Sequence, residues 1–219
     1  MTAEAGTRAG TRGGAIVGRP YRSGLRAQQT AATRRLVVDA ARGLFVANGW
    51  AATGMREVAA TAGVALETVY SHFSSKRGLL RAVADAAVVG DDASEPLAAR
   101  AEFLAMGVGR RPRRVRAAAE LLTAVHARTA AIAKLLRQAA AADGEIAEML
   151  QSTRERQRSD VARALELIIG RAPTRFERDG VWAITSPEVY LLLVEESGWT
   201  LEQYEAWVAD ALERVIPRS

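Results

Sequence analysis

The stretch from Thr53 to Lys76 constrains the fold of this chain more than any other part of the sequence. Two short runs of apolar residues at helical spacing lie on either side of Gly63, and glycine readily adopts the positive φ of a tight turn. The apolar positions are Val58, Ala59 and Ala62 before the glycine, and Val64, Val69 and Phe73 after it. This pattern predicts a helix, a turn and a second helix around one small core.

The second helix of this pair should present mostly polar side chains to solvent. They are Leu66, Glu67, Thr68, Tyr70, Ser71 and His72. Hydroxyl, carboxylate and imidazole groups hydrogen-bond phosphates and base edges, whereas an ordinary surface helix carries more paired Lys, Arg and Glu side chains. We therefore expect this helix to lie against DNA.

A longer motif runs through the same region without a gap. It reads AGV-x-x-x-T-V-Y-x-H-F-x-S-K from Ala62 to Lys76, and the apolar run Leu36–Phe45 precedes it. This arrangement resembles the DNA-binding domain of the tetracycline-repressor (TetR) family. The resemblance implies an all-α fold, in which an N-terminal three-helix helix-turn-helix domain is followed by a C-terminal helical bundle that binds a ligand and dimerises. Beyond residue 85 this expectation depends on helical periodicity and chain length.

Composition agrees with a soluble DNA-binding protein and excludes several other classes. The 219 residues are 49% hydrophobic, which is enough for a buried core. The absence of cysteine excludes disulfides and thiolate metal sites, and with only His72 and His126 as histidines we expect no metal and no cofactor. No run of eighteen apolar residues and no signal-peptide core is found, so we expect a cytoplasmic protein with no membrane partner.

Positive charge is concentrated at the N-terminus. The net charge of the chain is +5, and residues 1–28 hold five arginines against Glu4, which gives 5 − 1 = +4. We expect residues 1–28 to form a disordered basic arm, residues 29–84 the helix-turn-helix domain, and residues 85–219 the helical effector-binding and dimerisation domain. The arm is either a solvated tail or a segment that settles in the minor groove or along phosphates.

The candidate DNA surface begins before the turn. Thr53 is expected at the N-cap of the first helix, where its hydroxyl bonds a backbone donor, a phosphate or both. The resemblance places at Arg56 an arginine that reaches a base edge, and a guanidinium has the geometry to bind guanine. A phosphate contact or an ion pair with Glu57 is the alternative.

After the turn, Leu66 and Glu67 are predicted to read bases. Leu66 can contact a thymine methyl, and Glu67 can accept from a cytosine amino group or repel phosphates. Thr68 and Tyr70 are predicted to bond phosphates.

Two residues, one near the end of this helix and one just beyond it, complete the candidate DNA surface. His72 either donates to a phosphate or bonds the backbone, and Lys76 is expected to meet the DNA backbone from the far side. Ala65 and Glu67 depart from the family pattern, which usually has Ser or a similar cap at the first position and Gly, Ala or Pro at the second. An alanine there removes a cap of about 1 kcal/mol.

The distal part of the chain predicts a helix from Ser94 to Met106 and long helices over residues 112–142 and 145–169. Polar residues that interrupt or flank apolar stripes are candidates for an effector site, and they are His126, Thr153, Gln157 and Trp182. Mutual hydrogen bonds or a buried water are the alternative. The basic stretch 107–116 is expected to be a solvated loop and helix start, with a second DNA contact as its alternative.

The C-terminal segment, residues 176–216, is rich in apolar and aromatic side chains. Ser186-Pro187 marks either a break or a helix start, and Thr200 caps the last helix. Such helices suit a subunit interface, and the resemblance implies that the last two helices build the homodimer that a palindromic operator requires.

Together these features predict a ligand-responsive transcriptional repressor. It would bind a palindromic operator on double-stranded DNA as a homodimer and be released by a small-molecule effector. One alternative is a DNA-binding dimer with no effector. A second is a helical-bundle enzyme with an N-terminal helix-turn-helix, but the sequence offers no catalytic constellation and we assign no catalytic residue.

Overall fold

The computed structural model describes residues 20–90 and 95–216, with side chains of the first helix described from Arg26 onward. Every regular element in these ranges is helical, as the sequence predicts. In chain order they are α1 (Pro20–Ala52), α2 (Met55–Ala62), α3 (Leu66–Phe73), α4 (Lys76–Val89), η1 (Leu97–Ala99), α5 (Ala101–Leu104), η2 (Ala105–Gly107), α6 (Arg111–Ala140), α7 (Gly144–Ile169), α8 (Arg175–Ile184), α9 (Pro187–Tyr190), the π-helical η3 (Leu191–Glu196) and α10 (Leu201–Val215).

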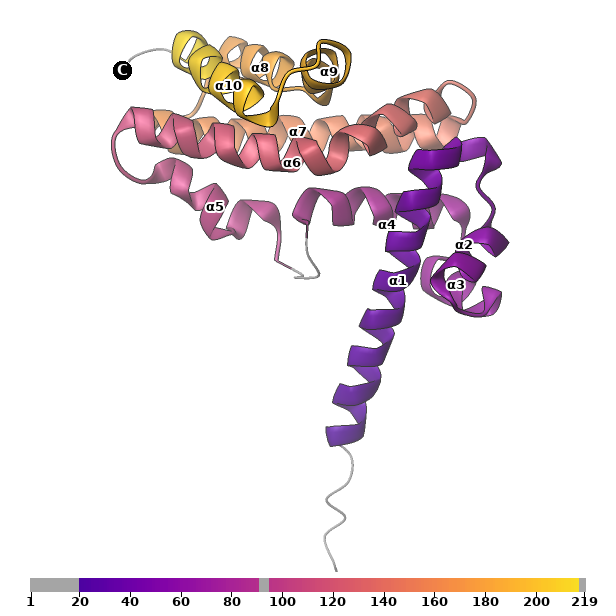
Figure 1. Ribbon diagram of the computed structural model, residues 1–219. Helices are drawn as coiled ribbons and strands as arrows, with labels where there is room; N and C mark the ends of the chain where they lie inside the picture. Colours follow the sequence, from indigo (N-terminus) through magenta and orange to yellow (C-terminus); the bar gives the residue numbers. More distant parts are fainter. Residues whose placement is uncertain (1–19, 91–94, 217–219) are drawn as a thin grey trace, which may run out of the picture.

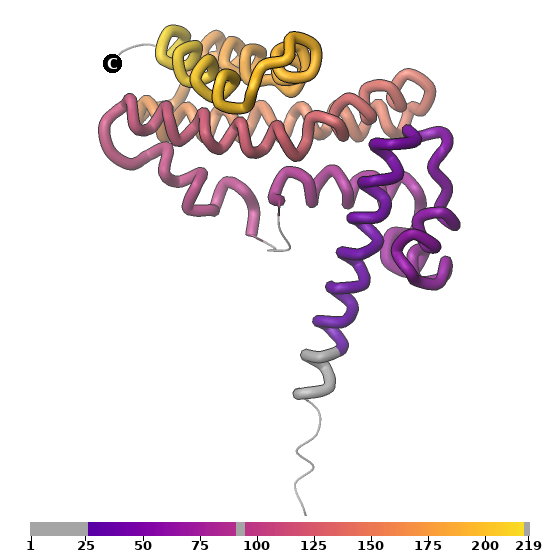
Figure 2. Tube along the Cα trace, in the orientation of Figure 1, coloured from indigo at the N-terminus to yellow at the C-terminus, as the bar shows by residue number. Residues whose placement is uncertain are grey.

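The long helices α6 and α7 form the middle layer of the molecule. Figure 1 shows α8, α9 and α10 on one side of this layer and α4 and α5 on the other, while α1, α2 and α3 gather at one end. The two helices run side by side in opposite directions (Figure 2), joined by a short turn that Asp143 caps. The predicted helices over residues 112–142 and 145–169 are confirmed.

One apolar core joins the N-terminal helices to the turn between α6 and α7. Within α1, the side chains of Val37, Ala41 and Phe45 are fully buried, and they pack with Val58 of α2 and Val69 of α3. The same core includes residues of α4, the end of α6 and the start of α7. The helix-turn-helix is therefore built directly on the distal layer, and α4 belongs to both.

The path of α1 breaks at Gly49. Gly49 has φ 79° and ψ 174°, a conformation that favours glycine, and Trp50 packs beyond it with its ring centroid 5.8 Å from that of Phe45. The start of α1 differs from the expectation. Residues 20–28 of the predicted disordered arm are helical, because Pro20 suits a first helical turn and the following residues continue into α1. Residues 1–19 of the arm lie outside the described residues.

A second apolar core lies between α6, α7 and the C-terminal helices. Tyr204 is its largest fully buried side chain, and its ring centroid is 5.0 Å from that of Tyr190. The predicted caps are present: Pro187 begins α9, and Thr200 accepts a hydrogen bond from the Gln203 backbone at 3.2 Å. The expected helix from Ser94 to Met106 is wrong, because the extended backbone at Arg100 divides this region into η1, α5 and η2.

The turn from α3 to α4 leaves no room for a side chain at Gly78. A Cβ built there would overlap the carbonyl oxygen of Phe73, which is backbone and cannot rotate away. We predict that Gly78→Ala lowers the free energy of unfolding by about 1–3 kcal/mol. Thermal and denaturant unfolding of the full chain would measure this.

Gly43 in α1 is the matched control. A Cβ there would meet no atom within 4 Å, and its backbone is helical. Gly43→Ala should therefore leave stability unchanged or raise it by up to about 1 kcal/mol. An equal loss in both variants would contradict the steric explanation.

Candidate nucleic-acid interface and ligand pocket

The turn between α2 and α3 has the geometry that the sequence predicts. Gly63 adopts φ 69° and ψ 31°, and the backbone N–H of Val64 donates to Ala59 at 3.0 Å. This closes α2 in the left-handed conformation that a glycine provides at a helix end. The chain then enters α3 at Ala65, which makes no side-chain capping bond. The predicted loss of this cap is confirmed.

Two faces of α3 differ in burial. Val69 and Phe73 are buried in the core, whereas Glu67, Tyr70 and Ser71 are exposed and Leu66, Thr68 and His72 are half-buried. The Ser71 hydroxyl donates to the Thr68 carbonyl at 2.8 Å. The structure thus brings the candidate DNA-contacting residues of α3 onto one accessible surface, and their roles on DNA stay predictions.

Arg56 lies exposed on α2 beside this surface. The alternative of an ion pair with Glu57 is not what the described residues form. The Glu57 carboxylate instead accepts from the side-chain amide of Asn48 at 3.1 Å and from the backbone N–H of Gly54 at 3.4 Å. Neighbouring residues on a helix point in different directions. The Arg56 guanidinium is therefore accessible to a molecule that binds at the surface formed by α2 and α3.

Thr53 does not lie on the candidate DNA surface, so that prediction is wrong. Its side chain is only 2% exposed, and Gly54 is the N-cap of α2. The Thr53 hydroxyl is 2.9 Å from the carbonyl oxygen of Gly49 and 3.1 Å from that of Leu44, both acceptors at the end of α1. The hydroxyl therefore satisfies the backbone around the Gly49 kink instead of a phosphate.

Lys76 is also turned toward the protein. Its ammonium donates to the carbonyl oxygen of Trp50 and lies 4.3 Å from the centroid of the indole ring, and burial lowers its pKa. This cation–π contact joins the start of α4 to the last turn of α1, beyond the kink at Gly49. A phosphate contact by Lys76 would have to share its ammonium with Trp50.

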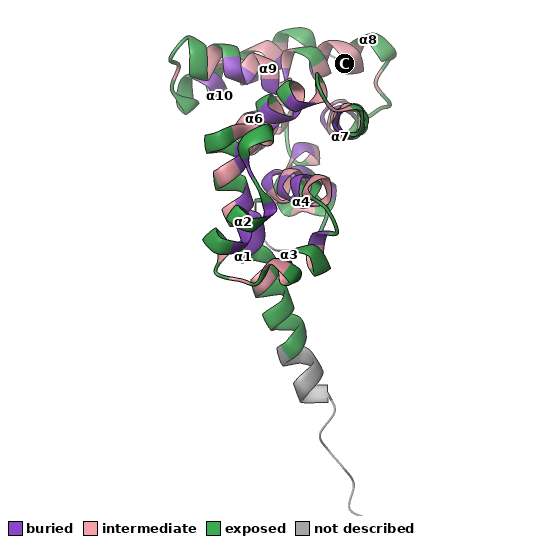
Figure 3. Ribbon diagram, turned by 90° about the vertical axis from the view of Figure 1, so that its right-hand side faces the viewer, coloured by how far each residue is buried: buried purple, intermediate pink, exposed green. Residues whose placement is uncertain are grey.

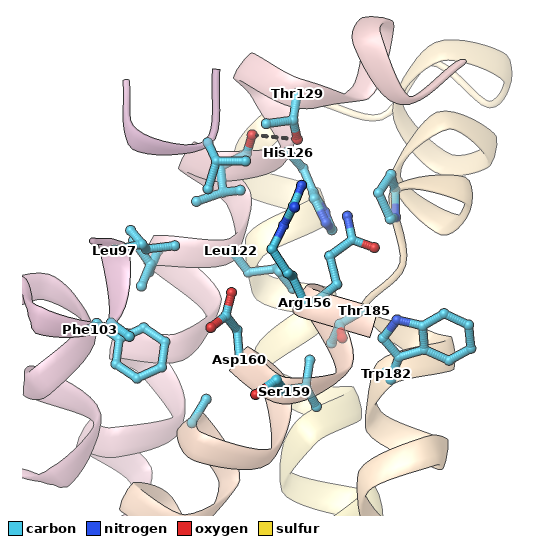
Figure 4. Close-up of a pocket in the computed structure, with 18 of the residues that line it drawn as sticks. Leu97, Phe103, Leu122, His126, Thr129, Arg156, Ser159, Asp160, Trp182 and Thr185 are labelled. Carbon is cyan, nitrogen blue, oxygen red and sulfur yellow. Dashed lines mark hydrogen bonds between the residues drawn. The ribbon is translucent and has the colours of Figure 1, made fainter. Parts of the chain in front are cut away.

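A cavity of about 550 Å³ lies between α4, η1, α6, α7 and α8. Aliphatic side chains make most of its lining, which is typical of sites for small organic molecules. All four candidate effector residues, His126, Thr153, Gln157 and Trp182, lie in this lining. Figure 4 shows His126 on one wall and Trp182 on another, with Asp160 directed toward Phe103. That they bind an effector stays a prediction.

His126 is held from behind by the C-terminal helices. The side chain is only 4% exposed, and its Nδ1 lies 2.8 Å from the hydroxyl of Tyr204. Burial lowers the pKa of His126 to about 4, against a smaller opposing effect of Glu188. The ring is therefore neutral at pH 7 and offers the pocket a hydrogen-bonding group without charge.

The remaining polar groups of the pocket are unequally satisfied. The hydroxyl of Thr153 donates to the carbonyl of Met149, one turn earlier in α7, at 2.9 Å. The indole N–H of Trp182 is buried and has no hydrogen-bond partner among the described residues. Asp160 carries a half-buried carboxylate whose pKa burial raises. A bound ligand with suitable polar atoms would supply hydrogen-bond partners to the Trp182 N–H and to the Asp160 carboxylate.

Three arginines that the sequence analysis did not single out tie α4 to the distal layer. Arg77 pairs with Asp143 at 2.9 Å at the start of α4, and Arg128 donates to the carbonyls of Ala87 and Val88 at its end. Between them, Arg156 of α7 lies 3.6 Å from Asp85. No local sequence pattern marks such partners, since they are separated by more than 40 residues or lie on different helices.

Two arginines of the basic stretch 107–116 bond to the ends of other helices. Arg111 donates to backbone carbonyls of Glu213 and Ile216 at the end of α10, and Arg114 to those of Leu167 and Ile168 at the end of α7. Helix ends expose unpaired carbonyls, which arginines satisfy well. Because α6 begins at the far end of the molecule from α3 (Figure 1), this stretch does not lie beside the candidate recognition helix, and the alternative of a second DNA contact stays a prediction.

Comparison with known proteins decides the family of the N-terminal part. Residues 37–83 match the family model of the tetR family of bacterial regulatory proteins. The chain carries a TetR-family DNA-binding domain. No curated protein matches the sequence.

Solved structures extend the likeness to the whole TetR-type fold. A TetR-family member from Streptomyces coelicolor is 19% identical, covers 85% of this chain and 99% of its own, and has a TM-score of 0.61. A regulator assigned to the family from Mesorhizobium loti is 16% identical, with 85% and 96% covered and a TM-score of 0.65. The multidrug binding protein EbrR, complexed with imidazole, is 20% identical, with 85% and 90% covered and a TM-score of 0.53. At these identities the likeness shows the fold.

Membrane-spanning helices and clusters of metal-ligating side chains are both absent from the described ranges. No helix there is long and apolar enough to span a membrane. No group of three or more His, Cys, Asp or Glu residues in residues 20–90 and 95–216 is placed to hold a metal ion.

The lowered pKa of His126 predicts a pH-dependent stability. The unfolded chain binds a proton at this residue near pH 6.5, whereas the folded protein binds it only near pH 4. Between these values the unfolded state holds more protons, so stability falls as the pH drops from about 6.5 to about 4, by roughly 3 kcal/mol. Denaturant unfolding over this range should show the loss, and His126→Gln should abolish that part of it. Equal pH profiles for the two proteins would contradict the prediction.

Proposed function

We propose that this protein is a homodimeric TetR-family transcriptional repressor, which binds a palindromic operator and is released from it by a small, mainly apolar effector. One observation carries the proposal. The helix α4 follows directly on the exposed recognition helix α3, and residues 84, 85, 88 and 89 of α4 form part of the wall of the 550 Å³ cavity. A ligand in that cavity therefore touches the element that positions the DNA-binding surface.

The DNA-binding roles proposed for the exposed residues follow from their positions. Arg56, Leu66 and Glu67 lie at the start of α2 and α3, where recognition helices contact base edges. Thr68 and Tyr70, with His72 beyond them, carry groups that suit phosphates. We leave Thr53 out of this set and give Lys76 at most a shared role.

Release by a ligand would act through α4. The helix is fixed at its start by Arg77 and at its end by Arg128, while the Asp85–Arg156 pair links its middle to α7 across the cavity. A ligand that binds more tightly when α4 and α7 lie further apart would shift the protein toward that arrangement. A coupling free energy of about 3 kcal/mol would reduce operator affinity roughly a hundredfold.

We place the homodimer interface in residues 176–216, on the outer side of α8 and α10. Phe176 is 89% exposed, and Leu192, Leu201 and Val215 are exposed over 41–52% of their surfaces. Such large apolar side chains on the outermost layer are typical of surfaces that pair with a partner. An interface formed by the same patch on both subunits gives the two-fold symmetry that a palindrome requires.

The alternatives are less well supported. A DNA-binding dimer without an effector would leave a cavity of this size, with an unpaired Trp182 N–H in it, without a use. Regulators of this family are generally not enzymes. EbrR, a protein of the same fold, is described as a multidrug binding protein, which favours a ligand site in this chain as well.

The test of the proposed function begins with selection of bound duplexes from random DNA. We expect enrichment of a palindrome, and Arg56→Ala should cost about 1–3 kcal/mol and relax selection at one base position. Small apolar compounds should then release the selected duplex. Ala118→Phe, which narrows the cavity, should keep DNA binding and lose the release. Failure to enrich any duplex would contradict the proposal.

The proposed interface predicts a specific effect of Phe176→Glu. A carboxylate buried without a partner costs about 3–5 kcal/mol, so the variant should sediment as a monomer at concentrations where the wild type is a dimer, and its operator affinity should fall with dimerisation. Leu104→Glu is the control, because Leu104 is 49% exposed and ends α5, which lies on the other side of the α6–α7 layer from α8 and α10 (Figure 1). If both variants behave like the wild type, the interface lies elsewhere.

A further inference from the structure

The first helix continues well beyond the domain that it helps to build. We call residues Arg26–Arg35 of α1 the projecting segment. All of its residues except the half-buried Thr33 are exposed, and burial in the core begins only at Val37. Figure 3 shows this part of α1 as an exposed rod that extends past α3 and away from the rest of the molecule.

The projecting segment has no face of large apolar side chains that could pack against another part of the protein. Its only apolar residues are alanines, and no acidic residue occurs between Arg26 and Val38. An isolated helix of this length is marginally stable in water. A partner that stabilises it must therefore supply polar or charged contacts. Arg35 pairs with Asp39 at 3.6 Å, so Arg26 and Arg34 are the two arginines that favour a negatively charged partner.

The side of the helix that faces α3 carries part of this charge. Val37 and Ala41 are fully buried in the core, and steps of three and four residues back along α1 lead from them to Arg34, Thr30 and Arg26, which share that side. Arg34 confirms the direction, because its guanidinium carbon lies 4.6 Å from the ring centroid of Phe73 in α3.

The length of the segment sets how far it reaches. Helical residues rise about 1.5 Å each, so Arg26 lies about 12 Å beyond Arg34, and hence beyond the contact with α3. Duplex DNA carries one phosphate charge per about 1.7 Å of its axis. A basic helix that starts beside the recognition helix and extends this far is placed to follow the phosphates next to the groove that α3 enters.

We propose that the projecting segment of α1 is a second DNA-contacting element, which lies along the phosphate backbone flanking the half-site read by α3. The proposal rests on the proposed DNA-binding function and adds a contact that reads no bases. It adds affinity that depends strongly on salt and on the length of duplex beyond the half-site.

The test compares two variants that each remove one arginine from an exposed position of α1. Arg26→Gln changes the projecting segment, and Arg42→Gln changes the body of the helix about 24 Å away. Glutamine keeps a high helix propensity, and circular dichroism should show both variants folded. Their affinities for the selected duplex are measured between 50 and 200 mM salt.

Because the dimer carries two copies of Arg26, we expect Arg26→Gln to reduce the slope of log affinity against log salt by about 1.8, or about 0.9 for each copy. The advantage of the wild type over Arg26→Gln should then shrink about twelvefold across this salt range, whereas Arg42→Gln should match the wild type. Trimming the duplex to the selected half-sites should weaken the wild type and have less effect on Arg26→Gln.

The outcomes separate this proposal from the function on which it rests. If no duplex is bound, the proposed function fails as well. If all three proteins bind with equal slopes and none is affected by trimming, DNA recognition stands and the second contact is overturned. A change in the sedimentation of DNA-free protein on Arg26→Gln would also overturn it, because the segment would then contact another copy of the chain.

Discussion

The anchoring of α4 at both ends is the constraint on which the rest of the structure depends. At its start Arg77 reaches Asp143 in the turn between α6 and α7, and at its end Arg128 satisfies carbonyls that the helix leaves unpaired. These contacts fix α4 to the same layer that forms the cavity, while its other side packs on α1 and α3. A displacement of α4 therefore cannot be absorbed locally, because packed cores shift between discrete arrangements.

Features set by neighbouring residues could be predicted from the sequence. The glycine turn at Gly63, the uncapped start of α3 at Ala65 and the capping of α10 by Thr200 each depend on a few adjacent side chains, and all three occur. His126 and Gln157 line the cavity. Both lie in or beside the apolar stripe of a helix that faces the core, and such positions border the space between packed helices. For these features a local pattern and the tertiary structure agree.

Features set by distant partners could not be predicted. Threonine is a common helix cap, and this suggests a capping role for Thr53. The kink at Gly49 instead brings carbonyls of α1 within hydrogen-bond distance of the Thr53 hydroxyl, and the side chain is buried. The arginines of residues 107–116 suggest nucleic acid until Arg111 and Arg114 are seen at the ends of α10 and α7. The charge of an arginine does not tell whether it stabilises the fold or binds DNA. Only the group that its guanidinium contacts distinguishes the two roles.

The same distinction applies to the two basic parts of the chain. In residues 107–116 the guanidinium groups of Arg111 and Arg114 bond to the protein, so that their charge stabilises helix ends. In the projecting segment the guanidinium of Arg34 lies over the ring of Phe73, while Arg26 is exposed about three helical turns before the first buried residue, Val37. Because α3 lacks a side-chain cap and depends on the packing of Val69 and Phe73, the contact of Arg34 with Phe73 also connects any DNA contact of the segment to the position of the recognition helix.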